Sequence, residues 1–357
     1  MDTNIILDAM PGRSIDIGGR QFLYFSGTSY LGMASNENFK VLLQEGLARY
    51  GANFGGSRLG NIRFAVFEEA EAWLAGFAGA PAALTVSSGS LAGRLVVEHL
   101  KGKAAFYFAP GTHPALWGEG DYYQGHFREW VEYILREAAE GEGPMALFAN
   151  SVDPLMVQKN SFGWLQQLPD NRPLVLVVDD SHGFGVCGPG GAGVYNELQA
   201  PDNVEVLVIS SLGKALGIPG GLILGGKYRI GQLWHSPFFG GASPAPPAFL
   251  YAMLRAAALY GPAHRKLLAN IRRFESLSGG TAILHSFEDY PAFYTPEAPL
   301  APWLEEKSCL ISQFAYPTPE DDPVTRIVLN ALHEEADIDY LAGAVNAYVA
   351  AGSAQKK

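Results

Sequence analysis

The chain has 357 residues, of which 48% are hydrophobic and 17% are charged, and this composition excludes a mainly disordered protein. Its length suits two domains. The formal net charge of −11, with no run of Lys or Arg, excludes the basic surfaces that bind nucleic acids.

The cysteines and the apolar segments indicate the cellular compartment in which we expect the protein. Cys187 and Cys309 cannot build a disulfide framework, and neither lies in a zinc-ligand spacing, so we expect no metal and a reducing environment. No window reaches the roughly 18 apolar residues of a spanning helix. Residues 1–12 lack the basic and then apolar pattern of a secretion signal. We therefore expect a cytoplasmic protein with no membrane partner.

Short apolar segments bounded by turn residues predict the strands of a mostly parallel sheet. Segments this short and continuously apolar are typical of strands buried on both faces. Helical patterns lie between them, as in residues 64–78, where aromatic residues and Leu74 recur at helical spacing. The predicted strands cover residues 82–88, 104–109, 145–149, 174–180, 205–211 and 221–225.

The pattern changes from residue 244 onward, after a proline-rich segment. A helix is predicted over residues 248–260, and strands are predicted over 281–287 and 326–330. A terminal helix is predicted over 338–351. We expect a second, α+β domain here.

Two acids end the strand predicted over residues 174–180, and a histidine follows it. The segment runs Val177, Val178, Asp179, Asp180, Ser181, His182, Gly183. In an open α/β sheet, ligands bind beyond the carboxyl ends of the strands, so Asp179 and His182 are expected where chemistry occurs. Taken alone, the motif is as compatible with a helix cap and a surface histidine.

A lysine lies between glycines after the strand predicted over residues 205–211. The segment runs Ser210, Ser211, Leu212, Gly213, Lys214, Ala215, Leu216, Gly217. Such a lysine reaches the crevice of the sheet, where desolvation lowers its pKa toward that of a nucleophilic amine able to form a Schiff base. The alternative is a surface lysine in a loop. The pairing with the Asp179 motif favours the first interpretation.

A third segment, residues 86–93, leads from a strand through small residues into a helix expected to begin near Ser90. Small side chains let backbone N–H groups and the helix dipole approach a phosphate. This signal is common in α/β proteins and is weak by itself.

The order of these motifs resembles that of fold-type-I pyridoxal-5′-phosphate (PLP) enzymes, and in detail that of the α-oxoamine synthase family. The resemblance runs from about Phe22 to His333. It includes a Tyr-Leu-Gly turn at residues 30–32, a Gly-Ser-rich segment at 55–58 and the run from Asp179 to Gly191.

The resemblance implies an α/β fold of the aspartate aminotransferase type. Its large PLP-binding domain, with a mostly parallel sheet, is expected over residues 46–240. An N-terminal segment is expected over 1–45 and a smaller α+β domain over 241–357.

The family's roles carry over to matching positions. Lys214 would hold PLP as a Schiff base, and Asp179 would face the pyridine nitrogen. His182 would bind the phenolic oxygen, and His113 would stack over the ring. The alternative for His113 is a turn histidine beside Pro114.

The phosphate and the substrate also have expected partners in the family. The phosphate would bind the turn at Gly89, the backbone N–H groups of Ser90 and Leu91, and the Ser211 hydroxyl. Arg326 matches the arginine that binds the substrate carboxylate, and the match extends to His333. The alternative is that Arg326 is an ordinary surface arginine.

Several positions depart from the family. Thr28 and Ser29 replace an Asn-Asp pair on the substrate side, and residues 150–155 replace a Glu-Gly-x-x-Ser-Met-Asp-Gly stretch. Asn150 either contacts the ring oxygen or is a plain turn asparagine. The loop at 238–244, which crosses a dimer interface in the family, lacks the usual Ser-Thr pair. Because only about twenty residues precede the opening strand, part of the thioester site is expected to be missing.

The resemblance implies a biosynthetic PLP-dependent acyltransferase that condenses an amino acid with an acyl-CoA, as a homodimer with a shared active site. One alternative is a PLP-dependent aminotransferase. Another is a catalytically inactive scaffold with a PLP fold, which the joint presence of Lys214, Asp179, His182 and His113 disfavours.

Overall fold

The computed structural model describes residues 5–278, 282–315, 318 and 320–355. Two compact units are present. The large unit contains Asn38–Asp153 and Lys159–Ala258. The small unit contains Met1–Glu37, Pro154–Gln158 and Leu259–Lys357. The three segments expected from the sequence, over residues 1–45, 46–240 and 241–357, stay a prediction.

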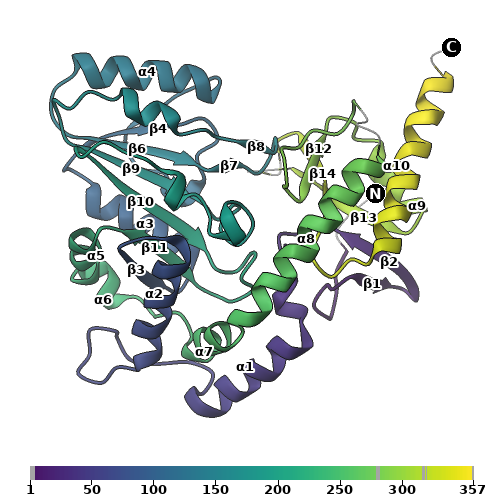
Figure 1. The fold of residues 1–357 in the computed structure, drawn as a ribbon, viewed down its shortest axis with the longest axis horizontal. Helices are drawn as coiled ribbons and strands as arrows, with labels where there is room; N and C mark the ends of the chain where they lie inside the picture. Colours follow the sequence, from purple (N-terminus) through teal and green to yellow (C-terminus); the bar gives the residue numbers. More distant parts are fainter. Residues whose placement is uncertain (1–4, 279–281, 316–317, 319, 356–357) are drawn as a thin grey trace. The chain divides into compact units, whose positions relative to one another are not determined.

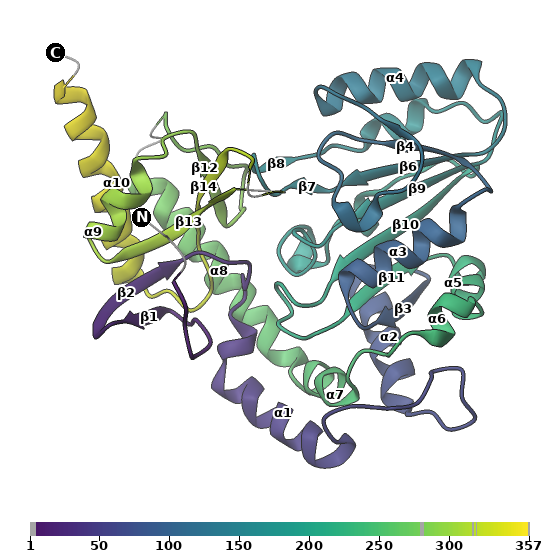
Figure 2. The same cartoon turned by 180° about the vertical axis from the view of Figure 1, so that it is seen from behind.

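A seven-stranded sheet forms the centre of the large unit (Figures 1 and 2). β11 runs antiparallel to both of its neighbours, and the other pairings are parallel, which confirms the predicted α/β fold with a mostly parallel sheet. In spatial order the strands are β3 (Ala82–Val86), β11 (Gly221–Gly225), β10 (Val204–Ser211), β9 (Leu174–Asp179), β6 (Met145–Asn150), β4 (Ala105–Phe108) and β5 (Asp121–Tyr122).

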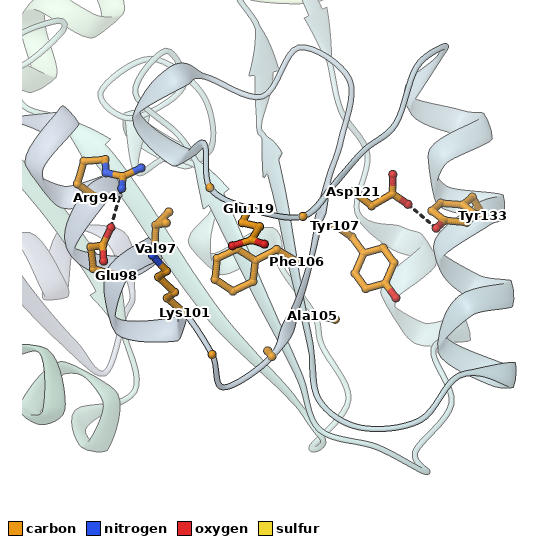
Figure 3. Close-up of a pocket in the computed structure, with 14 residues that line it drawn as sticks. Arg94, Val97, Glu98, Lys101, Ala105, Phe106, Tyr107, Glu119, Asp121 and Tyr133 are labelled. Carbon is orange, nitrogen blue, oxygen red and sulfur yellow. Dashed lines mark hydrogen bonds and ion pairs between the residues drawn. The ribbon is translucent and has the colours of Figure 1, made fainter.

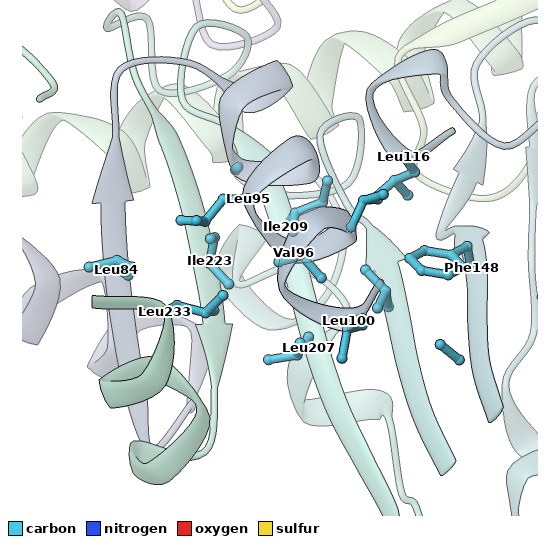
Figure 4. Close-up of a cluster of buried hydrophobic side chains, with 14 of the residues drawn as sticks. Leu84, Leu95, Val96, Leu100, Leu116, Phe148, Leu207, Ile209, Ile223 and Leu233 are labelled. Carbon is cyan, nitrogen blue, oxygen red and sulfur yellow. The ribbon is translucent and has the colours of Figure 1, made fainter. Parts of the chain in front are cut away.

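The apolar strands form because both of their faces are covered. Every residue of β6 and of β11 is buried. On one face, helix α3 (Gly89–Leu100) presents Leu95, Val96 and Leu100 to the sheet (Figure 4). Burial of such side chains is worth roughly 1.5–3 kcal/mol each, so this contact fixes α3 and the turn before it.

Other elements complete the large unit and the segments that connect it to the rest of the chain. The α-helices are α1 (Glu37–Tyr50), α2 (Ala65–Ala78), α4 (Phe127–Glu140), α5 (Lys227–Trp234), α6 (Pro237–Gly241) and α7 (Pro247–Arg255). The 3-10 helices are η1 (Met33–Ser35), η2 (Pro114–Leu116), η3 (Gly163–Gln167), η4 (Pro189–Gly191) and η5 (Tyr195–Glu197), and β7 (Val152–Asp153) and β8 (Gln158–Lys159) are two further short strands.

The small unit is built on a five-stranded mixed sheet that combines strands from both ends of the chain. β2 and β13 pair in parallel, and the other pairs are antiparallel. The order is β1 (Ser14–Ile17), β2 (Arg20–Phe25), β13 (Cys309–Ala315), β14 (Pro323–Val328) and β12 (Ala292–Thr295), with helices α8 (Ala257–Leu277), α9 (Leu300–Glu306) and α10 (Glu335–Gln355). The expected α+β character of the C-terminal part is therefore present, with strands added from the N-terminal part.

Two local predictions were wrong. The helix predicted over residues 248–260 is two helices, because Ala256 leaves the helical conformation at φ −82° and ψ 5°. The strand predicted over 281–287 is reduced to one bridge between His285 and Tyr294. A turn stops it, since Asp289 adopts φ 56° and the Tyr290 N–H donates back to the Phe287 carbonyl. Residue 281 lies outside the described residues.

Within the described part of the chain, no helix combines the length and the apolar character that crossing a bilayer requires.

Candidate active site

The residues predicted to bind the cofactor follow parallel strands of the large sheet. Parallel strands bring their carboxyl ends to the same edge. Asp179, the last residue of β9, is in register with Asn150 at the end of β6 and with Ile209 near the end of β10. The turns that follow these three strands therefore lie side by side.

The two acids at the end of β9, Asp179 and Asp180, point in different directions, as successive strand residues do. Asp179 is 8% exposed, and its Oδ1 accepts the Ser181 N–H at 2.9 Å. Asp180 faces the interior, where it accepts the Ser151 hydroxyl at 2.5 Å and the Val194 N–H at 2.9 Å. Burial raises the pKa of Asp180 to about 7. Asp180 thus anchors the following glycine-rich loop, and Asp179 is left at the edge of the sheet.

Lys214 lies in a tight turn after β10. The Gly217 N–H donates to the Lys214 carbonyl at 3.2 Å, and Leu212 and Gly220 close the base of the turn. Burial lowers the pKa of the Lys214 ammonium, and the Asp179 carboxylate acts in the opposite direction. Lys214 and Asp179 are therefore close enough to interact. A lowered pKa favours the neutral form of an amine, which is the nucleophilic one.

Ser181, which sequence reasoning missed, joins the Asp179 turn to β10. Its hydroxyl oxygen accepts the Ser211 N–H at 2.9 Å. The Ser211 hydroxyl oxygen in turn accepts the Gly213 N–H at 3.2 Å, beside Lys214. The available signal was the small residue before His182. His182 itself is half-buried in the same turn.

Gly89 allows α3 to begin against the end of β10. A Cβ at this position would lie 2.9 Å from Ser211 Cβ and 3.0 Å from Ser211 Cα. Only glycine fits this approach without a shift of the backbone. The first N–H groups of α3, at the positive end of its dipole, consequently lie beside Ser211.

The start of α3 differs from the prediction in one contact. The Ser88 side chain caps the helix by accepting the Leu91 N–H at 3.1 Å. The Leu91 N–H, expected to bind phosphate, therefore already has a partner. The backbone N–H groups of Gly89 and Ser90 come earlier in the helix, where no intrahelical carbonyl is available to them.

His113 lies in the turn after β4 and is half-buried. Its Nδ1 accepts the Ala115 N–H at 3.1 Å, so the neutral ring carries its proton on Nε2. Burial lowers the pKa of His113, Asp179 raises it and Lys214 lowers it. The structure thus brings His113, Asp179 and Lys214 within electrostatic range of one another.

Asn150 is 6% exposed and contacts the turn that carries His113. Its Nδ2 donates to the Gly111 carbonyl at 2.7 Å, and its Oδ1 accepts the His113 N–H at 3.3 Å. The contact expected between Asn150 and the cofactor ring stays a prediction.

The predicted substrate residues belong to the small unit. Arg326 is 8% exposed in β14, and its Nη1 donates to the Pro154 carbonyl. Its buried Nε has no hydrogen-bond partner among the described residues. A buried donor without a partner costs roughly 1–3 kcal/mol, so this guanidinium suits a ligand that supplies an acceptor. Thr28 is half-buried in the turn after β2.

His333, in the same motif as Arg326, has a structural role. It is fully buried, with Nδ1 accepting the Asn330 N–H at 3.1 Å and Nε2 lying 3.0 Å from the Tyr24 carbonyl. Burial lowers the pKa of His333 to about 4, so the ring is neutral and Nε2 donates. His333 therefore joins the end of β14 to β2.

A cavity of about 490 Å³ lies elsewhere in the large unit, at the C-terminal end of α3 (Figure 3). Its lining includes Arg94, Lys101 and Asp121 and none of the predicted site residues. The predicted phosphate turn is at the other end of this helix, which is about 18 Å long. Concavity alone therefore does not locate the site.

Comparison with known proteins agrees with the motifs. The sequence model of the family "aminotransferase class I and II" matches residues 163–345. The chain is 29% identical to the 8-amino-7-oxononanoate synthase of Dechloromonas aromatica, over 95% of this chain and 93% of that protein. It is 28% identical to the enzyme of the same name from Erwinia tasmaniensis, over 94% and 91%.

Solved structures show the same fold. Serine palmitoyltransferase from Sphingomonas wittichii superposes with a TM-score of 0.83 at 19% identity, over 98% of this chain and 92% of that one. The 8-amino-7-oxononanoate synthase of Francisella tularensis gives 0.72 at 20% identity, over 93% and 99%. These proteins are α-oxoamine synthases, which confirms the resemblance seen in the sequence. With the family match spanning just over half of its length, this chain belongs to the aminotransferase class I and II family of PLP-dependent transferases.

Proposed function

We propose that this chain is an α-oxoamine synthase, an acyltransferase that condenses an amino acid with the acyl group of an acyl-CoA. One observation carries the proposal: Asp179 ends β9, and Lys214 lies in the turn that follows the neighbouring parallel strand β10. Burial lowers the pKa of the Lys214 amine in this turn. The similarity to 8-amino-7-oxononanoate synthases over nearly the whole chain supports the same reaction class.

The residues at the edge of the large sheet fit PLP. The close approach of Gly89 to Ser211 brings together the N–H groups of Gly89 and Ser90 and the Ser211 hydroxyl, a set of donors that suits a phosphate. Asp179 would keep the pyridine nitrogen protonated, and His182 would bind the phenolic oxygen. When bound, PLP supplies an electron sink that stabilises negative charge at the α-carbon of the amino acid.

The chain's own groups would then handle protons and position the substrate. Lys214, with its lowered pKa, would hold the cofactor's aldehyde carbon and later carry the α-carbon proton as a general base. His113 would stack over the PLP ring, and its Nε2–H would be available as a hydrogen-bond donor. Arg326 would bind the substrate carboxylate with its unpartnered Nε, and Thr28 would lie on the substrate side.

We also propose a cytoplasmic homodimer with a shared active site. Leu59, Ile62 and Phe238 are exposed apolar side chains of the large unit. The Ser57 hydroxyl donates to the Gly240 carbonyl at 2.7 Å and so joins the loop before α2 to α6. An exposed apolar surface of this kind suits a second copy of the chain.

Thiol release tests the reaction directly. PLP-loaded protein is incubated with pairs of amino acids and acyl-CoAs, and free CoA is measured. We expect release that requires both substrates and is lost in Lys214→Ala but kept in the surface variant Lys227→Ala. Failure of every pair to release CoA would contradict the acyl transfer.

An aminotransferase is the second candidate. Thr28 and Asn150 stand where the synthases carry other residues, which favours a change on the acyl side of the site. An aminotransferase would convert PLP to its amine form with an amino donor alone, and an absorbance spectrum without any acyl-CoA would detect this change.

A further inference from the structure

The side chain of Asn150, at the end of β6, hydrogen-bonds to the turn that carries His113. Resting on the function proposed above, we propose that Asn150 is a positioning residue, which fixes the orientation of the His113 ring for the reaction. It would act through the backbone of residues 111–113.

Both ends of the Asn150 amide are committed to this turn. Nδ2 donates to the Gly111 carbonyl at 2.7 Å, and Oδ1 accepts the His113 N–H at 3.3 Å. Asn150 ends β6, which is buried along its whole length, and it is in register with Asp179. The amide therefore ties the His113 backbone to a rigid strand, next to the carboxylate of the site.

The orientation of the His113 ring follows from the backbone that Asn150 holds. Nδ1 accepts the Ala115 N–H only while residues 113–115 keep their conformation. That acceptor role leaves the proton on Nε2, so the ring is a directed donor. The Thr112 hydroxyl and Trp117 Nε1 stabilise the neighbouring peptide groups, but neither of them binds Gly111 or His113.

Only an amide can make both contacts. A carboxylate at position 150 would place a negative charge against the Gly111 carbonyl and beside Asp179, and it would have no proton to donate. Asn150→Asp thus keeps the shape and removes one of the two hydrogen bonds. Asn150→Ala removes both.

Asn160 offers a matched control. Its Nδ2 donates to the Asn150 backbone carbonyl at 2.9 Å, so it is an asparagine at the same strand end that does not contact the His113 turn. Asn160→Asp makes the same chemical change and should leave His113 as it is.

The test measures the tautomer of the His113 ring directly. Full-length protein with labelled histidines is followed by NMR, with and without PLP, and the His113 signals are assigned from a His113→Gln variant. In Asn150→Ala and Asn150→Asp we expect the Nε2–H tautomer signature of His113 to become mixed with that of the Nδ1–H form. Asn160→Asp should match the wild type.

Kinetics supply a second readout. Misplacement of a catalytic group costs up to about 100-fold in rate, so we expect kcat to fall by about 10- to 100-fold in the Asn150 variants. KM for the acyl donor should be unchanged. Asn150→Asp serves as the test if Asn150→Ala does not fold.

The proposal is overturned if both Asn150 variants keep the tautomer of His113 seen in Asn160→Asp. A wild-type protein that binds no PLP or releases no CoA would instead count against the proposed function. The NMR comparison without PLP would still decide the role of Asn150.

Discussion

Two histidines in turns of this molecule, His113 and His333, show how the same side chain serves different ends. His333 uses both ring nitrogens, one on the Asn330 N–H and one on the Tyr24 carbonyl. His113 uses Nδ1 for the Ala115 N–H, and its ring lies within electrostatic range of Lys214 and Asp179. His333 also has charged groups nearby, Asp337 among them, but both of its ring nitrogens bind the backbone, so the ring stabilises the fold. His113 uses one nitrogen for the backbone and lies beside two predicted site residues, which places its ring for a ligand.

We therefore expect substitutions near His113 to lower the enzymatic activity with little loss of stability. Substitutions near His333 should lower the stability and leave the activity per folded molecule unchanged. The largest effect on activity is expected at one of two adjacent acids, Asp179 and Asp180. Asp179→Asn should lower the activity about 10³-fold, because a neutral amide cannot hold the protonated cofactor ring. Asp180→Asn should instead lower the free energy of unfolding, since Asp180 accepts from both Ser151 and Val194.

Steady-state kinetics and urea unfolding of both variants show whether Asp179 serves activity and Asp180 serves stability. An Asp179→Asn protein with wild-type activity would contradict the role of Asp179.

The structural role of His333 also predicts how the free energy of unfolding depends on pH. The pKa of His333 is lowered to about 4 in the folded state, below its ordinary value of 6.5. The unfolded chain therefore binds the proton first, and the stabilisation present above pH 6.5 is lost as the pH falls toward 4. The loss is on the order of 3 kcal/mol.

Urea unfolding at pH 7, 5.5 and 4 measures this slope, and the wild type should lose more stability over this range than His333→Gln. A His333→Gln protein with reduced activity per folded molecule would contradict the structural role.

Gly89 belongs to both fold and site, so its substitution should affect both. The Cβ of Gly89→Ala would press on the Ser211 backbone, at a cost of about 1–3 kcal/mol in stability. We also expect PLP to bind about 10-fold more weakly, a change of about 1.4 kcal/mol. Gly76→Ala is the control, because a Cβ there meets nothing within 4 Å. Fluorescence titration with PLP measures the affinity, and equal affinities in the two variants would contradict a phosphate site at Gly89.

The smallest effect is expected at the helix cap. Ser88→Ala should lower the free energy of unfolding by about 1 kcal/mol, because the Leu91 N–H loses its acceptor. Ser88→Thr keeps a hydroxyl and should lose less. Thermal unfolding of the pair measures the difference, and a Ser88→Ala protein as stable as the wild type would argue against the cap.

The sequence predicts most of the large sheet because strands buried on both faces are continuously apolar. It does not predict β5, whose two residues, Asp121 and Tyr122, are too few to form a pattern. The small unit is harder, since β2 and β13 are distant in sequence and pair only in the folded chain.

The candidate site divides in the same way. Lys214 and Asp179 follow predicted strands, so their neighbourhood follows from the parallel sheet. The contacts of Asn150 with Gly111 and His113 join residues up to 39 positions apart, and no local pattern encodes them. The use of the Leu91 N–H by Ser88 likewise depends on where the helix begins.

The central claim is that Lys214 holds PLP at the carboxyl edge of the large sheet. Borohydride reduction of the PLP-loaded full-length protein, followed by digestion and mass mapping, tests it most directly. We expect the cofactor mass on Lys214 alone, and no labelled peptide from Lys214→Ala. Reduction that labels a different lysine, or that labels none while PLP is bound, would contradict the account.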